Sequence, residues 1–128
     1  LVLTGCFAAF SCSKKESERF RLLTGPVWVT DSLLANGVNA AGPGGLLTKF
    51  MGDAKFKADG TGYFGKYTGT WMFSSGETKL VIESDSLVLP VTADIKELTS
   101  ISLKLTTLFP NLTDLQHPYN IRMTFKSK

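Results

Sequence analysis

Short runs of alternating apolar and polar residues follow one another along most of this chain, and they restrict its fold more than any other feature. Leu103 and Leu105 alternate with polar neighbours, as do Ile121, Met123 and Phe125. Because successive side chains of a strand point to opposite faces, such runs are typical of β-strands with one buried and one solvated face. We expect strands over residues 26–34, 54–58, 61–67, 70–74, 79–83, 87–98, 101–108 and 119–126.

Turn signals separate these runs. The pair Asp59-Gly60 between two aromatic-bearing runs indicates a tight hairpin. Pro90 lacks an N–H for a strand ladder, so we place it at a bulge, an edge or a strand start. Residues 16–23 suit one or two helical turns, which end at Thr24-Gly25-Pro26. Together these features predict an all-β fold, an antiparallel up-and-down barrel of about eight strands, with a short N-terminal helical turn.

The inward faces of the expected strands supply candidate residues for lining a ligand site. They are Trp28, Phe56, Tyr63, Trp71, Phe73, Ile82, Leu103, Leu105, Met123 and Phe125. In so small a barrel the same side chains also serve as core, so lining and core are alternative interpretations. A long loop runs from Asn36 towards a helical turn expected over residues 46–51, and its glycines Gly42, Gly44 and Gly45 are candidate lid residues.

The first twelve residues differ from the rest of the chain. None is charged, both cysteines, Cys6 and Cys12, lie among them, and a polar segment follows from Ser13. This is the pattern of a secretory leader that meets a polar tether. An initiator Met and a basic segment are missing from the start, so we expect the sequence to begin inside the leader. We divide it into a signal peptide (1–12), a tether (13–21) and a barrel domain (22–128).

The leader resembles a bacterial lipoprotein signal, in which an aliphatic residue and two small residues precede an acylated cysteine. Leu3-Thr-Gly-Cys6 matches at every position, whereas Ala9-Phe-Ser-Cys12 matches less well but places the acyl chains directly before the tether. We favour Cys12, with Cys6 as the alternative. An ordinary cleaved signal peptide with incidental cysteines is the remaining interpretation. Acylation implies attachment to a membrane of the bacterial cell envelope, at the periplasmic or surface face of the outer membrane.

Much of the positive charge of the chain lies in the tether. The formal net charge is +3, from 14 Lys and Arg against 11 Asp and Glu, and residues 14–21 hold four bases and two acids. Residues 22–128 are therefore nearly neutral, and a nucleic-acid partner is not expected. No cysteine follows Cys12, so disulfides do not hold the barrel together.

Five short motifs extend over most of the expected barrel. They are Leu22-Leu-Thr-Gly-Pro-Val-Trp28, Phe56-Lys-Ala-Asp-Gly-Thr-Gly62, Gly69-Thr-Trp71, Thr78-Lys-Leu-Val-Ile82 and Glu97-Leu-Thr-Ser-Ile-Ser-Leu-Lys104. In this order they resemble the lipocalin-like domains of small bacterial envelope lipoproteins, and the resemblance spans residues 22–125. It implies a calycin-like barrel with Trp28 plugging one end, and a role in binding a small ligand or a partner.

Patterns for catalysis, cofactors or metals are weak. Gly60-Thr-Gly-Tyr-Phe-Gly65 matches a dinucleotide fingerprint, but strand and turn residues follow it where a helix is required, so we interpret its glycines as hairpin residues. His117 is the single histidine and lies in a loop-like segment without Cys, Asp or Glu at the spacing of metal ligands. Asp94 and Glu97, three residues apart on a strand, are expected on opposite faces as solvated charges. We expect no enzyme activity, no cofactor and no metal site.

Two segments, Asp31-Ser-Leu33 and Asp85-Ser-Leu87, resemble the short sites of O-glycosylation in some Gram-negative envelope proteins. Asp-Ser is also common near turns, which is the competing interpretation.

The sequence therefore favours a non-catalytic, lipid-anchored envelope protein whose barrel binds a small apolar ligand through its open end and its Gly-rich loop. A cavity of about 300 Å³ or more is expected of such a carrier. The alternative is a protein-interaction module, an accessory subunit or inhibitor, with a solid barrel. An exposed, contiguous apolar patch around residues 38–51 or 109–119 is expected of the module.

Overall fold

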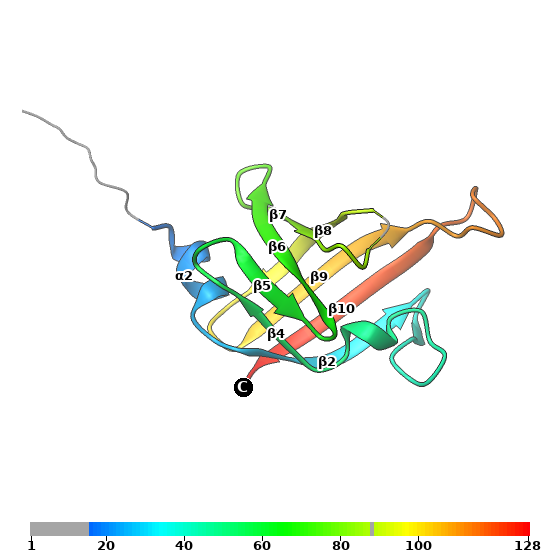
Figure 1. The fold of residues 1–128 in the computed structure, drawn as a ribbon, viewed down its shortest axis with the longest axis horizontal. Coiled ribbons are helices and arrows are strands. Elements are labelled where there is room, and N and C mark those ends of the chain that lie inside the picture. Colours follow the sequence, from blue (N-terminus) through cyan, green and yellow to red (C-terminus); the bar gives the residue numbers. More distant parts are fainter. Residues whose placement is uncertain (1–15, 88) are drawn as a thin grey trace, which may run out of the picture.

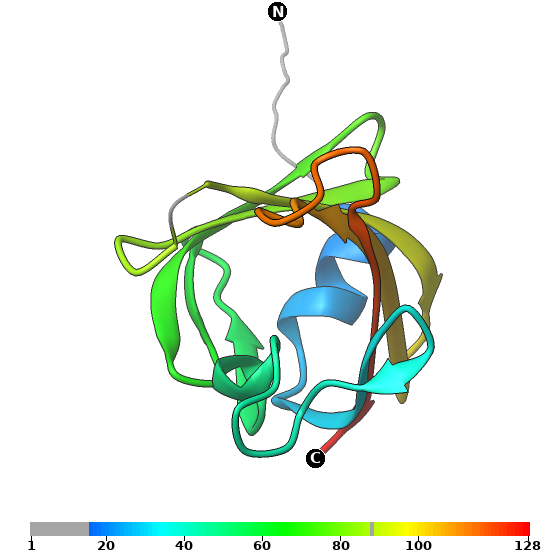
Figure 2. The same ribbon diagram turned by 90° about the vertical axis from the view of Figure 1, so that its right-hand side faces the viewer.

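Eight antiparallel strands close into a barrel in the computed structural model, which describes residues 16–87 and 89–128 (Figure 1). Figure 2 shows the ring of strands end-on, with the helix α2 across its far end. The elements are α2 (Glu18–Thr24), β2 (Trp28–Ala35), β3 (Val38–Asn39), η1 (Thr48–Phe50), β4 (Asp53–Phe56), β5 (Thr61–Phe64), β6 (Tyr67–Ser74), β7 (Lys79–Glu83), β8 (Val91–Leu98), β9 (Ser102–Phe109) and β10 (Tyr119–Ser127).

The topology is up-and-down. From β4 to β10 each strand pairs with the next one along the chain, β4 pairs with β2, and β10 returns to pair with β2 along almost its whole length. The two-residue strand β3 is added to the end of β2 outside this ring. The predicted fold class, an eight-stranded antiparallel barrel with a short N-terminal helix, is confirmed.

Two predicted strand boundaries are wrong, for backbone reasons. The run 61–67 is divided between β5 and β6 by a turn at Gly65, whose φ of 64° suits glycine. The run 87–98 begins as a strand only at Val91. Pro90 immediately precedes that first residue, where its missing N–H costs no ladder hydrogen bond.

A short hairpin was not expected at the end of β2. Asn36 and Gly37 both have positive φ, 52° and 80°, as a two-residue hairpin turn of the primed types requires, and they join β2 to β3. The predicted helical turn over residues 46–51 is present as the 3-10 helix η1.

The helix α2 is fastened to the barrel at both of its ends. The Ser17 hydroxyl accepts a hydrogen bond from the Phe20 N–H as an N-cap and donates one to the Glu77 carboxylate. The Lys55 ammonium group donates to the carbonyls of Thr24, Gly25 and Pro26, at 2.7, 3.0 and 3.2 Å. Ser17 therefore contacts the barrel although it lies inside the segment assigned to the tether.

A β-bulge in β2 changes which side chains face inward. Thr30 pairs with Phe125 and Ser32 with Thr124, which leaves Asp31 as an extra residue. Because of this residue, Trp28 and Leu33 both point into the core although they are five positions apart.

No helix in residues 16–87 and 89–128 is long and apolar enough to cross a membrane. Cys6 and Cys12, the candidate acylation sites, lie outside the described residues.

Candidate binding site

Nine of the ten residues predicted to line a ligand site face the barrel interior. Phe73 is half-buried and packs against the core, and the other eight are buried: Trp28, Phe56, Trp71, Ile82, Leu103, Leu105, Met123 and Phe125. The exception is Tyr63, which lies between Gly62 and Phe64, the two residues of β5 that are buried. Alternation therefore places Tyr63 on the outer face. Glycine has no side chain to signal its face, so the sequence pattern concealed this register.

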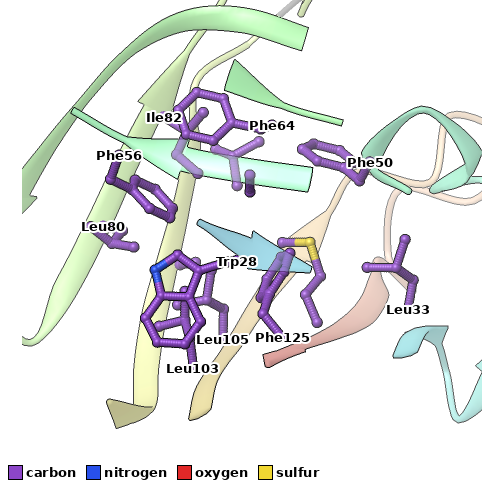
Figure 3. Packing of buried hydrophobic residues seen from close by; sticks show 14 of the residues in the cluster. Trp28, Leu33, Phe50, Phe56, Phe64, Leu80, Ile82, Leu103, Leu105 and Phe125 are labelled. Atoms are coloured by element: carbon purple, nitrogen blue, oxygen red, sulfur yellow. The ribbon is translucent and has the colours of Figure 1, made fainter. Parts of the chain in front are cut away.

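Aromatic rings occupy much of the interior (Figure 3). Phe56 packs against Phe64 with ring centroids 5.1 Å apart and against Trp71 at 5.8 Å, edge to face. Trp71 also contacts Phe73 at 5.4 Å and Phe20 of α2 at 5.8 Å. These spacings are those of rings in direct contact. The residues predicted as candidates for ligand lining thus contact one another.

Trp28 and α2 close one end of the barrel. The indole N–H of Trp28 donates to the carbonyl of Leu23 at 3.0 Å, and neither side chain has measurable exposure. This arrangement satisfies the one polar atom of a buried tryptophan. Trp28 has the plugging position that the resemblance to lipocalin-like domains implied.

The Gly-rich loop fills the other end. Leu47 is fully buried, and Phe50 packs against Tyr67 with ring centroids 4.7 Å apart. The Thr48 hydroxyl bridges the carbonyls of Gly42 and Gly45, and a Cβ on Gly45 would approach the Ala40 carbonyl oxygen to 2.3 Å. The predicted lid residues Gly42, Gly44 and Gly45 therefore belong to a loop that plugs the barrel in this structure.

Four hollows stand out in the described part of the molecule, and all of them open to solvent. We call the first the outer hollow. It has a volume of about 650 Å³ and lies on the outer wall, where it is lined by Leu34, Gly37, Lys79, Thr92, Asp94, Thr106, Thr107, Leu108, Asn120, Ile121 and Arg122.

Strand register explains how the outer hollow brings together residues that are distant in the sequence. Lys79 pairs with Asp94, Asp94 with Thr106, Thr106 with Arg122, and Arg122 with Leu34. These five residues form one row across five strands. The sequence analysis did not identify this site. The one local sign of the outer hollow in the sequence is Leu108, an apolar residue on the polar face of the alternating run 101–108.

The two carboxylates of β8, Asp94 and Glu97, interact with side chains of the neighbouring strands. Asp94 and Glu97 share the outer face, contrary to the prediction, because a bulge between Ile95 and Glu97 inserts an extra residue. A hydrogen bond and charge from Lys79 lower the pKa of Asp94. The Ser102 hydroxyl, followed by the charge of Lys104, lowers the pKa of Glu97. Each carboxylate is thus favoured in its ionised form.

His117 has an acidic neighbour that the spacing argument overlooked. Its ring Nδ1 lies 2.7 Å from a carboxylate oxygen of Asp114 on the exposed loop between β9 and β10. No group of three metal-ligating side chains occurs among the described residues. The glycines of the fingerprint-like segment lie in hairpin strands and turns, as predicted, with positive φ at Gly60 and Gly65.

The two candidate glycosylation serines differ in accessibility. Ser32 lies within β2 and its hydroxyl is hydrogen-bonded to Thr124 at 2.8 Å. Ser86 is exposed in the turn after β7. The geometry therefore favours Ser86 as the one of the two that a modifying enzyme reaches.

The loops at the end of the barrel away from α2 (Figure 1) carry several exposed apolar side chains. We use the name open-end loops for the loops at the end of the barrel opposite α2, although Leu47 and Phe50 fill that end. These loops are β3 with the segment that leads to β4, the β7–β8 loop and the β9–β10 loop. Among residues 16–87 and 89–128, six of the nine exposed large apolar side chains belong to these loops and Leu108 adjoins them: Val38, Leu46, Met51, Leu89, Leu108, Leu112 and Leu115. Leu112 and Leu115 are 87% and 74% exposed. Exposed apolar residues therefore occur in both segments where the protein-interaction module was expected to have a contiguous apolar patch.

Neither the family models nor the curated proteins searched contain a match to this chain.

Proposed function

We propose that this protein is a non-catalytic, membrane-anchored component of a bacterial envelope whose solid barrel binds a protein partner through its outer surface. The observation that supports this role most strongly is the packed interior. Buried side chains from all eight strands of the barrel pack together there (Figure 3). The helix α2, with Leu23, fills one end of the barrel, and Leu47 and Phe50 fill the other.

Carriage of a small apolar ligand, which the family resemblance implies, requires space inside. Ligand sites commonly occupy about 300 to 1,000 Å³. In this barrel Leu103, Phe56 and Trp28 are at most 1% exposed, so a ligand would have to displace core side chains. Surface binding needs no such rearrangement, and exposed apolar side chains are available at the open-end loops.

An acyl anchor at Cys12 would set the orientation. Ser17, whose hydroxyl donates to Glu77 of the barrel, is five positions after Cys12, so the chain between them spans at most about 18 Å. The α2 end would then face the membrane and the open-end loops would face away from it. That geometry presents the exposed apolar side chains to a partner outside the anchoring membrane.

Native mass spectrometry of protein purified with its own lipids distinguishes the two roles. We expect a polypeptide bound in a fixed ratio, and its loss when Leu112 and Leu115 are both changed to Ser. Met72→Ser is the matched control, since Met72 is 60% exposed on β6, away from these loops. A small apolar molecule retained at one per barrel, without a second chain, would contradict the proposal.

The anchor has a separate test. Cys12→Ser should release the protein from the membrane fraction, whereas Cys6→Ser should leave it bound. The reverse result would assign the anchor to Cys6, and release by neither variant would remove acylation from the proposal.

A further inference from the structure

Arg122 lies in the outer hollow, and the described part of the chain supplies no partner for its side chain. Within residues 16–87 and 89–128 its guanidinium group makes no ion pair and no hydrogen bond. The other charges of the hollow neutralise each other, because Lys79 and Asp94 form an ion pair at 2.5 Å. The net positive charge of the hollow therefore belongs to Arg122.

The polar groups beside Arg122 suit an oxygen anion. Thr106 is its direct neighbour on β9, so the two Cβ atoms lie about 5 Å apart. Asn120 is two positions earlier on the same face of β10, about 7 Å along the strand. A guanidinium group with hydroxyl and amide donors nearby fits the two oxygens of a carboxylate.

Aliphatic side chains flank the same arginine. Leu34 is its neighbour on β2, and Leu108 of β9 is 59% exposed. An arginine with exposed aliphatic neighbours resembles the centre of a protein–protein interface more than a site for a free inorganic ion.

We propose that the outer hollow is the docking site for a partner's polypeptide segment that presents one carboxylate between aliphatic side chains. The carboxylate pairs with Arg122, and the aliphatic side chains contact Leu34 and Leu108. The inference rests on the proposed function, because it names the chemistry of the partner that the solid barrel binds. Charge complementarity selects this occupant: the hollow offers one unpaired cation, so its ligand supplies one anion.

An NMR titration of the full chain with a short peptide tests this site. The probe is acetyl-Leu-Glu-Leu-amide, and the matched probe has Gln in place of Glu. We expect the amide signals of Leu34, Leu108 and Arg122 to shift with the Glu peptide at a Kd of about 1 mM. Binding of the Gln peptide should be about fivefold weaker, as for the loss of one exposed ion pair.

Two variants separate the site from general charge effects. Arg122→Gln should weaken binding of the Glu peptide about fivefold and abolish its preference over the Gln peptide. Lys66→Gln removes the same charge from the exposed β5–β6 turn, outside the hollow, and should leave binding unchanged. The unperturbed amide spectrum of each variant confirms that it is folded.

Several outcomes would overturn the inference. Absence of shifts up to about 10 mM peptide, or equal binding by Arg122→Gln, removes the site. If inorganic phosphate produces the same shifts at the same concentration, the outer hollow is a simple anion site to which contacts with Leu34 and Leu108 contribute nothing. Self-association that protects these amides assigns the hollow to a second copy of the chain. In each case a polypeptide retained in native mass spectrometry still supports the proposed function, so the two failures are distinguishable.

Discussion

At the scale of single residues, Lys55 links α2 to the barrel. Its ammonium group reaches three consecutive carbonyls that follow the last turn of the helix, where no helical N–H is available to them. A cation at this position also interacts favourably with the helix dipole. The side chain thus satisfies several acceptors that the chain cannot satisfy by its own backbone.

Lys55→Met should therefore lower the free energy of unfolding by about 1 to 2 kcal/mol, since it removes the charged donor and leaves those carbonyls to water. Urea denaturation measures the change. Lys57→Met, in the exposed end of the same hairpin, is the control and should stay within about 0.5 kcal/mol of the parent. Equal effects of the two substitutions would mean that the Lys55 contacts contribute nothing specific.

The carboxylates of β8 predict how stability depends on pH. The pKa values of Asp94 and Glu97 are lowered by Lys79 and Ser102 respectively, from ordinary values of 3.8 and 4.5. Groups with lowered pKa stabilise the folded state above their unfolded pKa, and this contribution disappears as the pH falls through the folded pKa. The barrel should thus lose stability as the pH falls below about 4.5.

The double variant Asp94→Asn, Glu97→Gln should show a smaller loss of stability on acidification than the parent, when urea midpoints at pH 7 and pH 3 are compared. Glu83→Gln is the control, because Glu83 is exposed and has no ion pair among the described residues. An unchanged difference between the two pH values in the double variant would show that these pairs do not couple to folding.

At the scale of elements, α2 belongs to the barrel and not to the tether. Ser17 and Arg19 bind Glu77 in the β6–β7 turn, where Ser75, Gly76 and Glu77 all have positive φ. Such a turn is strained at its non-glycine positions, and contacts with α2 help to hold it. Phe20 adds a ring to the aromatic core.

A chain that starts at Leu22 should be less stable than one that starts at Glu16 by about 2 to 3 kcal/mol, because it lacks the cap and the Phe20 packing. Thermal unfolding of the two fragments measures this. Identical melting temperatures would place α2 outside the cooperative unit.

The sequence predicted most strands because alternation records which face each residue occupies. It predicted β7 with its observed bounds, and nine of ten interior candidates. It failed for Asp94 and Glu97, where the alternation shifts by one residue at the bulge between Ile95 and Glu97. A bulge inserts a residue without a characteristic composition, so the sequence contains no clear sign of it. The outer hollow was missed for a related reason: its row of residues depends on register across five strands.

In the molecule as a whole, the interior of the barrel is packed, and the surfaces that we propose for binding lie on its outside. Eight strands, the helix α2 and the Gly-rich loop enclose a core built of side chains in contact with one another. The open-end loops and the outer hollow remain the surfaces on which apolar and charged groups are displayed. The packed interior is the feature that favours the proposed partner-binding role over carriage of a ligand inside the barrel.

A crystal structure of the protein under xenon pressure shows whether the barrel contains an apolar cavity, because xenon enters apolar cavities that are empty of water. Leu103→Ala, which should cost about 2 to 5 kcal/mol and create a cavity, is the positive control and should bind xenon between β8 and β10. We predict no xenon site inside the parent barrel, within the ring formed by Trp28, Phe56 and Leu103. Xenon bound there in the parent protein would show that the interior is not solid, and it would favour the ligand-carrier interpretation.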